Sequence, residues 1–300
     1  MVNLRLRLRD VTCRSRNVTK TYPWKQGPCA MHHPVIILLV LSVTALVKIL
    51  AFFLTKLFSQ ILLNDRTNNL ILGDELSSRI VGGQNAEIGF FPYQASIKSS
   101  NGKHICNGAI ISANTILTVA HCVYRKRPSS LSVTVGTNRL SIGGSVYYVK
   151  EVKIHEKYNS WNLRNDIAVL KLMNEISMNG AAYPIFLGDS FVNGGVACVL
   201  SGWGFRQESG PVSEYLQYVF LETLNNNECS KQLSTTIEES QMCTFTKIGE
   251  GSCYQDSGSP LVADGVLIAV VTSGHPCAEG YPDIYTRVSY FHKWITDNSS

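Results

Sequence analysis

Several sequence patterns are missing from this chain of 300 residues. It contains no collagen-like glycine period, no heptad run and no internal repeat, which excludes fibrous, coiled-coil and solenoid architectures. Charged residues are few, at 16%, whereas hydrophobic residues make up 45% of the chain. This balance excludes general disorder and is sufficient for one large domain or two packed subdomains with a hydrophobic core.

Metal-binding spacings are also missing. The nine cysteines include no C-x-x-C pair, and no cluster of Cys and His has the spacing of a zinc site. Seven of the cysteines are dispersed after residue 100, behind an apolar N-terminal segment. Dispersed cysteines in this arrangement are typical of an oxidising compartment. We expect no bound metal.

A basic stripe is absent from most of the chain. Residues 1–79 carry 11 Lys or Arg against 4 Asp or Glu, whereas residues 80–300 carry 16 against 18. The positive excess is therefore concentrated in the N-terminal segment, residues 1–34. We expect no nucleic-acid partner, since that function needs a basic surface on the folded part.

An apolar segment follows the basic N-terminus. Residues 35–47 are apolar or small, Lys48 interrupts them, and apolar side chains continue to residue 54. This run fits the h-region of a signal peptide, and V-T-A at 43–45 offers a cleavage site. A signal anchor would need about 20 apolar residues. It would place Lys48 in the hydrocarbon at a cost of about 2.5–3.5 kcal/mol, which the many Leu and Ile side chains would offset.

Both interpretations place the chain from about residue 60 onward outside the cytosol. We expect cleavage and secretion to the extracellular space. The alternative is a single-pass membrane protein in which residues 35–55 remain as an uncleaved anchor.

From residue 80 onward the sequence has a residue pattern typical of β-structure. Short runs of alternating or β-branched residues recur, and Gly, Asn, Pro and Ser separate them. Examples are residues 93–98, 116–119, 131–135, 146–149, 167–172 and 266–271. This spacing predicts an all-β barrel or sandwich. Only the C-terminal end has a helical pattern, because Val288, Phe291, Trp294 and Ile295 repeat on one helical face.

Three short segments carry residues suited to nucleophilic catalysis. T-V-A-H-C contains His121, N-D-I-A-V-L contains Asp166, and D-S-G-S-P contains Ser257. A serine hydroxyl is a poor nucleophile near neutral pH and needs a base such as histidine. The histidine in turn needs a carboxylate that holds its other ring nitrogen. Each segment alone is a weak signal, but the order His, Asp, Ser at separations of 45 and 91 residues is much more specific.

With these segments in this order, residues 80–300 resemble a serine endopeptidase of the trypsin/chymotrypsin fold. R-I-V-G-G at 79–83 resembles the family's activation site, and other family blocks are S-G-W-G at 201–204 and Y-T-R-V at 285–288. The stretches C-T-F-T-K at 243–247 and G-H-P-C-A at 274–278 are similar to insect chymotrypsins. The resemblance implies two packed six-stranded antiparallel β-barrels, a C-terminal helix and an active site in the cleft between the barrels.

The resemblance also implies the chemistry. Ser257 attacks the scissile carbonyl, His121 acts as base and then as acid, and Asp166 orients His121. The backbone N–H groups of Gln255 and Ser257 hold the oxyanion. Hydrolysis through this acyl-enzyme needs water but no cofactor. The implied partners are protein or peptide substrates.

Activation follows from the same resemblance. Cleavage after Arg79 frees the α-amine of Ile80, which in the family pairs with the carboxylate before the nucleophile, here Asp256. A buried carboxylate without a partner is costly, so this ion pair orders the oxyanion loop and the specificity pocket. An activating protease and protein inhibitors are then further partners. The chain divides into a basic segment (1–34), a signal peptide or signal anchor (35–59), an activation propeptide (60–79) and a serine protease domain (80–300).

The resemblance assigns the cysteines as well. It pairs Cys106 with Cys122, Cys229 with Cys243, and Cys253 with Cys277. Each bridge closes a loop worth about 3 kcal/mol in the chain-entropy model. Cys198 is left over, because Ala263 occupies the position to which the family often bridges it, and we expect a buried free thiol. Some relatives bind calcium in an acidic loop, but residues 128–150 contain no carboxylate, so we expect no calcium there.

The sequence departs from its family near the nucleophile. Gln255 stands where the family has Gly, and its Cβ restricts φ and ψ. If this peptide flips, one oxyanion donor is lost, at a cost of about 100- to 1000-fold in rate. If it does not flip, Gln255 extends over the leaving-group side. Ser259 and Asn107 also replace glycines.

The segment that pairs with the substrate backbone as an added strand is formed by Thr272, Ser273 and Gly274. Ser273 replaces an aromatic wall of the family. These departures motivate an alternative, a catalytically weak homologue that binds proteins through the same cleft. The intact triad and the intact activation site favour the enzyme.

Several residues at the positions of the family's specificity pocket differ from those of its relatives. Gly251 stands where trypsin-like relatives have Asp, and Gly274 leaves the pocket mouth open. Asp283 stands where relatives usually have Gly. Facing inward, its carboxylate would attract Lys or Arg or narrow the pocket. Turned away or hydrated beside Ser252, it would leave room for large apolar residues. We favour chymotrypsin-like or broadened specificity.

Overall fold

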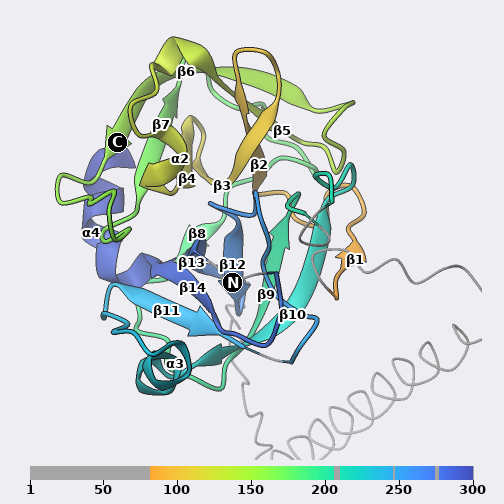
Figure 1. Cartoon of the computed structure of the whole chain (residues 1–300). Coiled ribbons are helices and arrows are strands. Elements are labelled where there is room, and N and C mark those ends of the chain that lie inside the picture. The colour runs from red at the N-terminus through yellow and green to blue at the C-terminus, as the bar shows by residue number, and fades with distance from the viewer. Residues whose placement is uncertain (1–81, 206–209, 246, 274–276, 300) are drawn as a thin grey trace, which may run out of the picture. The chain divides into compact units, whose positions relative to one another are not determined.

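The computed structural model describes residues 82–299 apart from 206–209, 246 and 274–276 (Figure 1). The chain divides into two compact units, Met1–Glu75 and Leu76–Ser300, and only the second contains described residues. The expected segments 1–34, 35–59 and 60–79 therefore lie outside the described residues. So do Arg79 and Ile80 at the expected activation site and Gly274 at the expected pocket mouth.

The first barrel is a closed antiparallel sheet with the strand order β2-β3-β4-β7-β6-β5. Its strands are β2 (Gln94–Ser99), β3 (His104–Ser112), β4 (Thr115–Thr118), β5 (Leu131–Val135), β6 (Ser145–Ile154) and β7 (Ala168–Leu172). Short β-branched and apolar runs form these strands, as their composition predicts. Ile97, Ile110, Ile116 and Leu170 are fully buried inside the barrel.

The second barrel follows the order β10-β11-β14-β13-β12-β9, and pairing of β9 with β10 closes it. Its strands are β9 (Ala197–Gly202), β10 (Gln217–Leu224), β11 (Gln241–Thr244), β12 (Pro260–Ala263), β13 (Val266–Ser273) and β14 (Asp283–Arg287). Two short strands are added, β1 (Gln84–Asn85) beside β10 and β8 (Phe186–Leu187) parallel to β13. The expected fold of two six-stranded barrels is confirmed.

In the part of the chain that the structure describes, helices are few and short, except at the C-terminal end. They are α2 (Ala120–Val123), the 3₁₀ turn η1 (Pro128–Ser130), α3 (Asn226–Leu233) and α4 (Val288–Ser299). In α4, Val288, Phe291 and Ile295 are buried, which agrees with the predicted apolar face. Within the described residues, no helix has the length and apolarity needed to cross a membrane.

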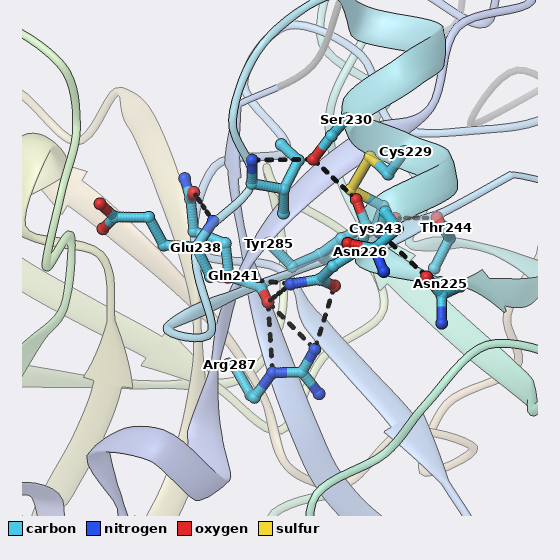
Figure 2. The surroundings of a disulfide bond; sticks show 12 residues. Asn225, Asn226, Cys229, Ser230, Glu238, Gln241, Cys243, Thr244, Tyr285 and Arg287 are labelled. Atoms are coloured by element: carbon cyan, nitrogen blue, oxygen red, sulfur yellow. Dashed lines mark hydrogen bonds between the residues drawn. A yellow bond between two sulfur atoms is a disulfide. The ribbon is translucent and has the colours of Figure 1, made fainter.

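Three disulfides join the cysteine pairs that the resemblance implies. They are Cys106–Cys122, Cys229–Cys243 and Cys253–Cys277. Figure 2 shows the second bridge, which links α3 to β11 above the guanidinium of Arg287. Arg287 is buried and donates to backbone carbonyls such as that of Gln241, at 3.0 Å from Nη2, so it ties the end of β14 to this region.

The seventh cysteine of the described residues is a free thiol. Cys198 on β9 is buried, and its Sγ donates to the carbonyl of Leu221 at 3.4 Å. Burial raises the pKa of this thiol to about 12. A thiol in this environment behaves as a small hydrophobic side chain.

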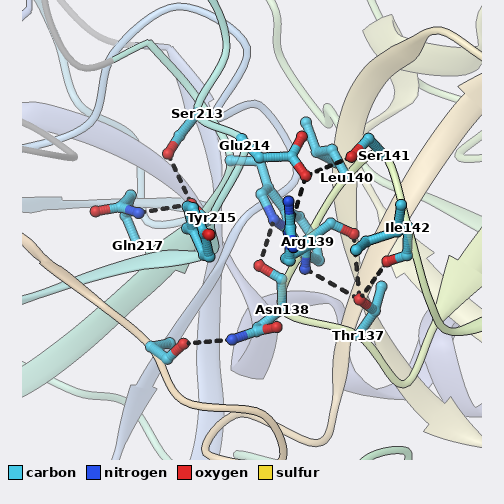
Figure 3. A network of polar contacts seen from close by, with 12 residues as sticks. Thr137, Asn138, Arg139, Leu140, Ser141, Ile142, Ser213, Glu214, Tyr215 and Gln217 are labelled. Carbon is cyan, nitrogen blue, oxygen red and sulfur yellow. Dashed lines mark hydrogen bonds and ion pairs between the residues drawn. The ribbon is translucent and has the colours of Figure 1, made fainter.

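A polar network joins the two barrels at one side (Figure 3). The loop after β5 contributes Arg139, whose Nε donates to Glu214 at 3.2 Å. Glu214 precedes β10, and its carbonyl accepts the N–H of Leu140 at 3.0 Å. The N–H of Leu216 donates to Asn138 at 2.6 Å. These bonds hold the barrels in a set arrangement, which positions the groups that lie between them.

Candidate active site

His121 and Asp166 are joined by two hydrogen bonds within the first barrel. The Nδ1–H of His121 donates to Asp166 Oδ2 at 2.7 Å, and its backbone N–H donates to Oδ1 at 2.8 Å. His121 lies in α2, and Asp166 lies two residues before β7. The carboxylate is buried, whereas 26% of the His121 side chain is exposed. The bonds orient the ring, and the tautomer with the proton on Nδ1 leaves Nε2 unprotonated and able to accept a proton.

The second barrel also holds Asp166. The hydroxyl of Thr272 on β13 donates to Asp166 Oδ2, and Thr286 Oγ1 on β14 donates to the Asp166 carbonyl at 2.8 Å. The expected place of Thr272 in the substrate strand concerns its backbone and stays a prediction, whereas its side chain contacts Asp166. Neither threonine contact was predicted from the sequence, because both join positions more than 100 residues apart.

Ser257 lies in the turn that precedes β12, at the edge of the second barrel. Its carbonyl accepts the N–H of Asn107 on β3 at 2.8 Å. The next residue, Gly258, has a φ of +79°, and a Cβ there would lie 2.1 Å from the Asn107 carbonyl oxygen. Only glycine fits this close approach. The turn is therefore shaped so that the nucleophile loop packs directly on the first barrel.

A cavity of about 200 Å³ opens beside Ser257. Its lining residues are Ser252, Cys253, Tyr254, Gln255, Ser257, Val271, Ser273 and Cys277. The structure thus brings together Ser257, the expected oxyanion residue Gln255, the expected pocket residue Ser252 and the expected substrate-strand residue Ser273. Within the described residues no hydrogen bond joins Ser257 to His121, which is a common state of catalytic pairs before substrate binds.

Gln255 retains a glycine-like backbone. Its φ is +66°, which lies in the left-handed region that L side chains avoid. Its carbonyl accepts a hydrogen bond from Asn107 Nδ2 at 2.9 Å. The sequence did not predict this contact, although it singled out both positions as exchanges of glycine.

Asp283, at the start of β14, contacts Ser252, which is one of the residues that line the cavity. Its Oδ2 accepts the backbone N–H of Ser252 at 2.6 Å. A Cβ on Gly251 would lie 2.7 Å from the same oxygen, so the carboxylate occupies the space beside this glycine. Burial raises the pKa of Asp283 to about 7, and hydrogen bonds from Ser252 partly oppose the rise.

Asp256, next to Ser257, is fully buried. Its carboxylate accepts the N–H of Gly204 at 2.9 Å and of Cys253 at 3.0 Å. Burial, with a smaller contribution from the neighbouring charge of Asp283, raises its pKa to about 7, and the hydrogen bonds from Cys253 and Gly204 partly oppose the rise. Within the described residues Asp256 forms no ion pair. Among the described residues, this buried carboxyl group therefore has no cationic partner.

One cluster in the described part of the chain has three side chains of ligand type within 4.8 Å, namely Cys106, His121 and Cys122. Both sulfurs form the Cys106–Cys122 disulfide, so neither is available as a thiolate ligand. This cluster does not have the chemistry of a metal site.

Comparison with known proteins agrees with this architecture. A family model described as Trypsin matches residues 80–295. The chain is 41% identical over 220 residues to Chymotrypsin-2 of Vespa crabro, covering 73% of this chain and 99% of that protein. It is 35% identical over 230 residues to Trypsin alpha-4 of Lucilia cuprina, covering 75% and 89%. It is 36% identical over 231 residues to Trypsin alpha of Drosophila melanogaster, covering 75% and 90%. The resemblance is confirmed, and the chain belongs to the trypsin family of serine endopeptidases.

Proposed function

We propose that the chain is the secreted zymogen of an endopeptidase that cuts proteins or peptides through an acyl-enzyme. The observation that carries this proposal is the pair of hydrogen bonds from His121 to Asp166, at 2.7 and 2.8 Å. They hold an imidazole in one orientation while part of it stays exposed. Ser257 lines a cavity whose floor and walls suit a substrate side chain.

In the proposed reaction, the Ser257 oxygen attacks the scissile carbonyl carbon while His121 Nε2 takes the hydroxyl proton. The oxyanion that forms accepts hydrogen bonds from the N–H groups of Gln255 and Ser257. His121 then gives its proton to the leaving amine as the peptide bond breaks. Water repeats the sequence on the acyl-enzyme and releases the second product. Asp166 stabilises the imidazolium formed in each half.

Activation is proposed to proceed by cleavage after Arg79. The new α-ammonium of Ile80 would pair with Asp256. Burial raises the pKa of this carboxyl group, so a nearby cation would stabilise its charged form. Gly82 supports this route, because a Cβ there would lie 2.5 Å from the Gly249 carbonyl oxygen. The chain just after the cleavage point is therefore packed against the segment leading to the pocket.

The proposed specificity is chymotrypsin-like or broadened. Gly251 contributes no charge to the pocket floor, and the Asp283 carboxyl group is engaged by Ser252 at 2.6 Å. A carboxyl group that accepts internal hydrogen bonds and has a pKa of about 7 is partly neutral near neutral pH. Large apolar side chains then enter without facing a full charge.

Two further proposals concern location and partners. Residues 35–59 would act as a signal peptide, which makes the protein extracellular, or else as a membrane anchor. The mass of the secreted product separates the two, because cleavage removes the whole basic N-terminus. An activating protease and protein inhibitors that fill the cleft are the expected partners besides substrates.

Active-site titration tests the proposal. The chain is cleaved after Arg79, Ile80 is verified as the new N-terminus, and acylated Ser257 is counted with peptide esters ending in Phe, Leu, Ala or Arg. We expect a stoichiometric burst that is absent from Ser257→Ala. If folded, correctly cleaved protein gives no burst with any ester, the proposal is wrong. The cleft would then belong to a protein-binding homologue, the alternative that Gln255, Ser259 and Ser273 favour.

A further inference from the structure

Asn107 occupies the boundary between the two barrels and is fully buried. All its polar groups are hydrogen-bonded. The N–H donates to Ser257 O at 2.8 Å, the carbonyl accepts from Thr118 Oγ1 at 2.8 Å, Oδ1 accepts from Gln94 Nε2 at 3.2 Å and Trp203 N at 3.4 Å, and Nδ2 donates to Gln255 O at 2.9 Å. A buried amide with every group satisfied has one orientation and holds its partners rigidly.

Two of these bonds grip the nucleophile loop on either side of Asp256. The backbone of Asn107 holds the carbonyl of Ser257, and its side chain holds the carbonyl of Gln255. The two N–H groups proposed to bind the oxyanion belong to the same short segment. Asn107 therefore connects the first barrel to the segment that carries both donors.

The presence of a side chain at Gln255 explains why its backbone needs to be held in place. A non-glycine residue in the left-handed region is strained, and Gln255 has a φ of +66°. To relax to a negative φ, the residue must rotate a peptide group on one or both of its sides. The bond from Asn107 Nδ2 holds the peptide group that follows Gln255, which leaves fewer routes for relaxation.

We propose that Asn107 is a positioning residue for the oxyanion hole, in which its side-chain amide holds the Gln255 carbonyl so that the strained loop keeps its N–H donors in place. This role rests on the proposed endopeptidase function. It explains why the chain replaces the family's glycine at both position 107 and position 255. Gln255 needs the hydrogen bond from Asn107 to hold its backbone, whereas a glycine at 255 would not need it.

A double-mutant cycle tests the role, using chain cleaved after Arg79 and normalised by active-site titration. We expect Asn107→Gly to lower kcat at least about 10-fold with KM within about twofold, because an oxyanion donor acts in the transition state. A peptidyl aldehyde, whose hemiacetal oxygen occupies the same hole, should lose affinity by a similar factor. In the Gln255→Gly background, Asn107→Gly should change kcat less than about threefold.

Asn107→Ala serves as a second variant, and near-UV circular dichroism checks that each protein is folded. An unchanged kcat in Asn107→Gly, or an equal loss in both backgrounds, overturns the positioning role, since a merely structural residue shows no coupling to position 255. The parent enzyme reports separately on the proposed function. An inactive parent counts against that function and, with it, against the role of Asn107.

Discussion

Asp283 Oδ2 accepts the backbone N–H of Ser252, a residue that lines the cavity beside Ser257, at 2.6 Å. The carboxyl group is thus held by the segment that precedes the nucleophile. The sequence left its orientation open between attraction of basic side chains and accommodation of apolar ones. If the cavity beside Ser257 receives the substrate side chain, as proposed, we expect the preference to depend on the protonation of this carboxyl group.

The first prediction concerns the pH dependence of substrate choice. The pKa of Asp283 is raised to about 7, so the group is mostly neutral at pH 6 and mostly charged at pH 8. The ratio of kcat/KM for an Arg ester to that for a Phe ester should rise about 3- to 10-fold over this range. Effects of pH that are common to both substrates cancel in the ratio. Asp283→Asn is the matched control, and its ratio should be flat. A flat ratio in the parent would contradict the prediction.

The second prediction concerns the pH dependence of stability in the uncleaved chain. Asp256 has its pKa raised from 3.8 to about 7, so the unfolded chain loses this proton first and stability falls as pH rises from about 4 to 7. Asp283 acts in the same direction. His104, with its pKa lowered to about 4 by burial, opposes them up to its ordinary value of 6.5.

Comparing Asp256→Asn with the parent isolates one carboxyl group, because His104 and Asp283 are common to both. The melting temperature of the variant minus that of the parent should increase as pH rises from 5 to 8. In the chain cleaved after Arg79, the parent should instead have the higher melting temperature at pH 8, because it then has an ion pair between Ile80 and Asp256 that the variant lacks. Parallel melting curves for the two uncleaved proteins at both pH values would refute this assignment.

A third prediction concerns Thr272. Its hydroxyl donates to the same Asp166 oxygen that His121 Nδ1 contacts, and a hydrogen bond to a charged group is worth about 1.5–3 kcal/mol. Thr272→Val keeps the shape and removes the donor, so kcat should fall about 10-fold or more while KM changes little. Thr272→Ser keeps the donor and should stay close to the parent. Equal kcat values for the Val and Ser variants would show that this bond is irrelevant to turnover.

A fourth prediction concerns the free thiol. Val199 and Val262 are partners across β9 and β12, which places Ala263 opposite Cys198. Opposed antiparallel residues have Cα separations of about 4.5–5.5 Å, within disulfide range. Ala263→Cys should therefore form a bridge that raises the free energy of unfolding by up to about 4 kcal/mol.

The measurement is the melting temperature with and without reductant, and the control is Cys198→Ala with Ala263→Cys, in which no bridge forms. In the parent, Cys198 should stay unmodified by a thiol reagent until the protein unfolds, because burial raises its pKa to about 12. Rapid modification of the native parent would place this thiol in a solvent-accessible setting instead.

The sequence predicts the fold and the main residues of the site because they depend on local blocks and their order. The apolar face of Val288, Phe291 and Ile295 is one example, and the order of His121, Asp166 and Ser257 is another. What the sequence does not predict are the contacts of Thr272 with Asp166 and of Asn107 with Gln255, which span 106 and 148 residues. These depend on how two barrels dock, and no periodicity within one strand encodes that.

The hydrogen bond from the Asn107 amide to Ser257 crosses from one barrel to the other at 2.8 Å. A buried amide exchanges its hydrogen with deuterated solvent only when its bond opens. This bond opens when the nucleophile loop separates from β3. The exchange rate of this single amide therefore reports on how readily the contact between the two barrels opens. Exchange as slow as that of neighbouring amides within β3 means that the barrels open only by unfolding together as one cooperative unit.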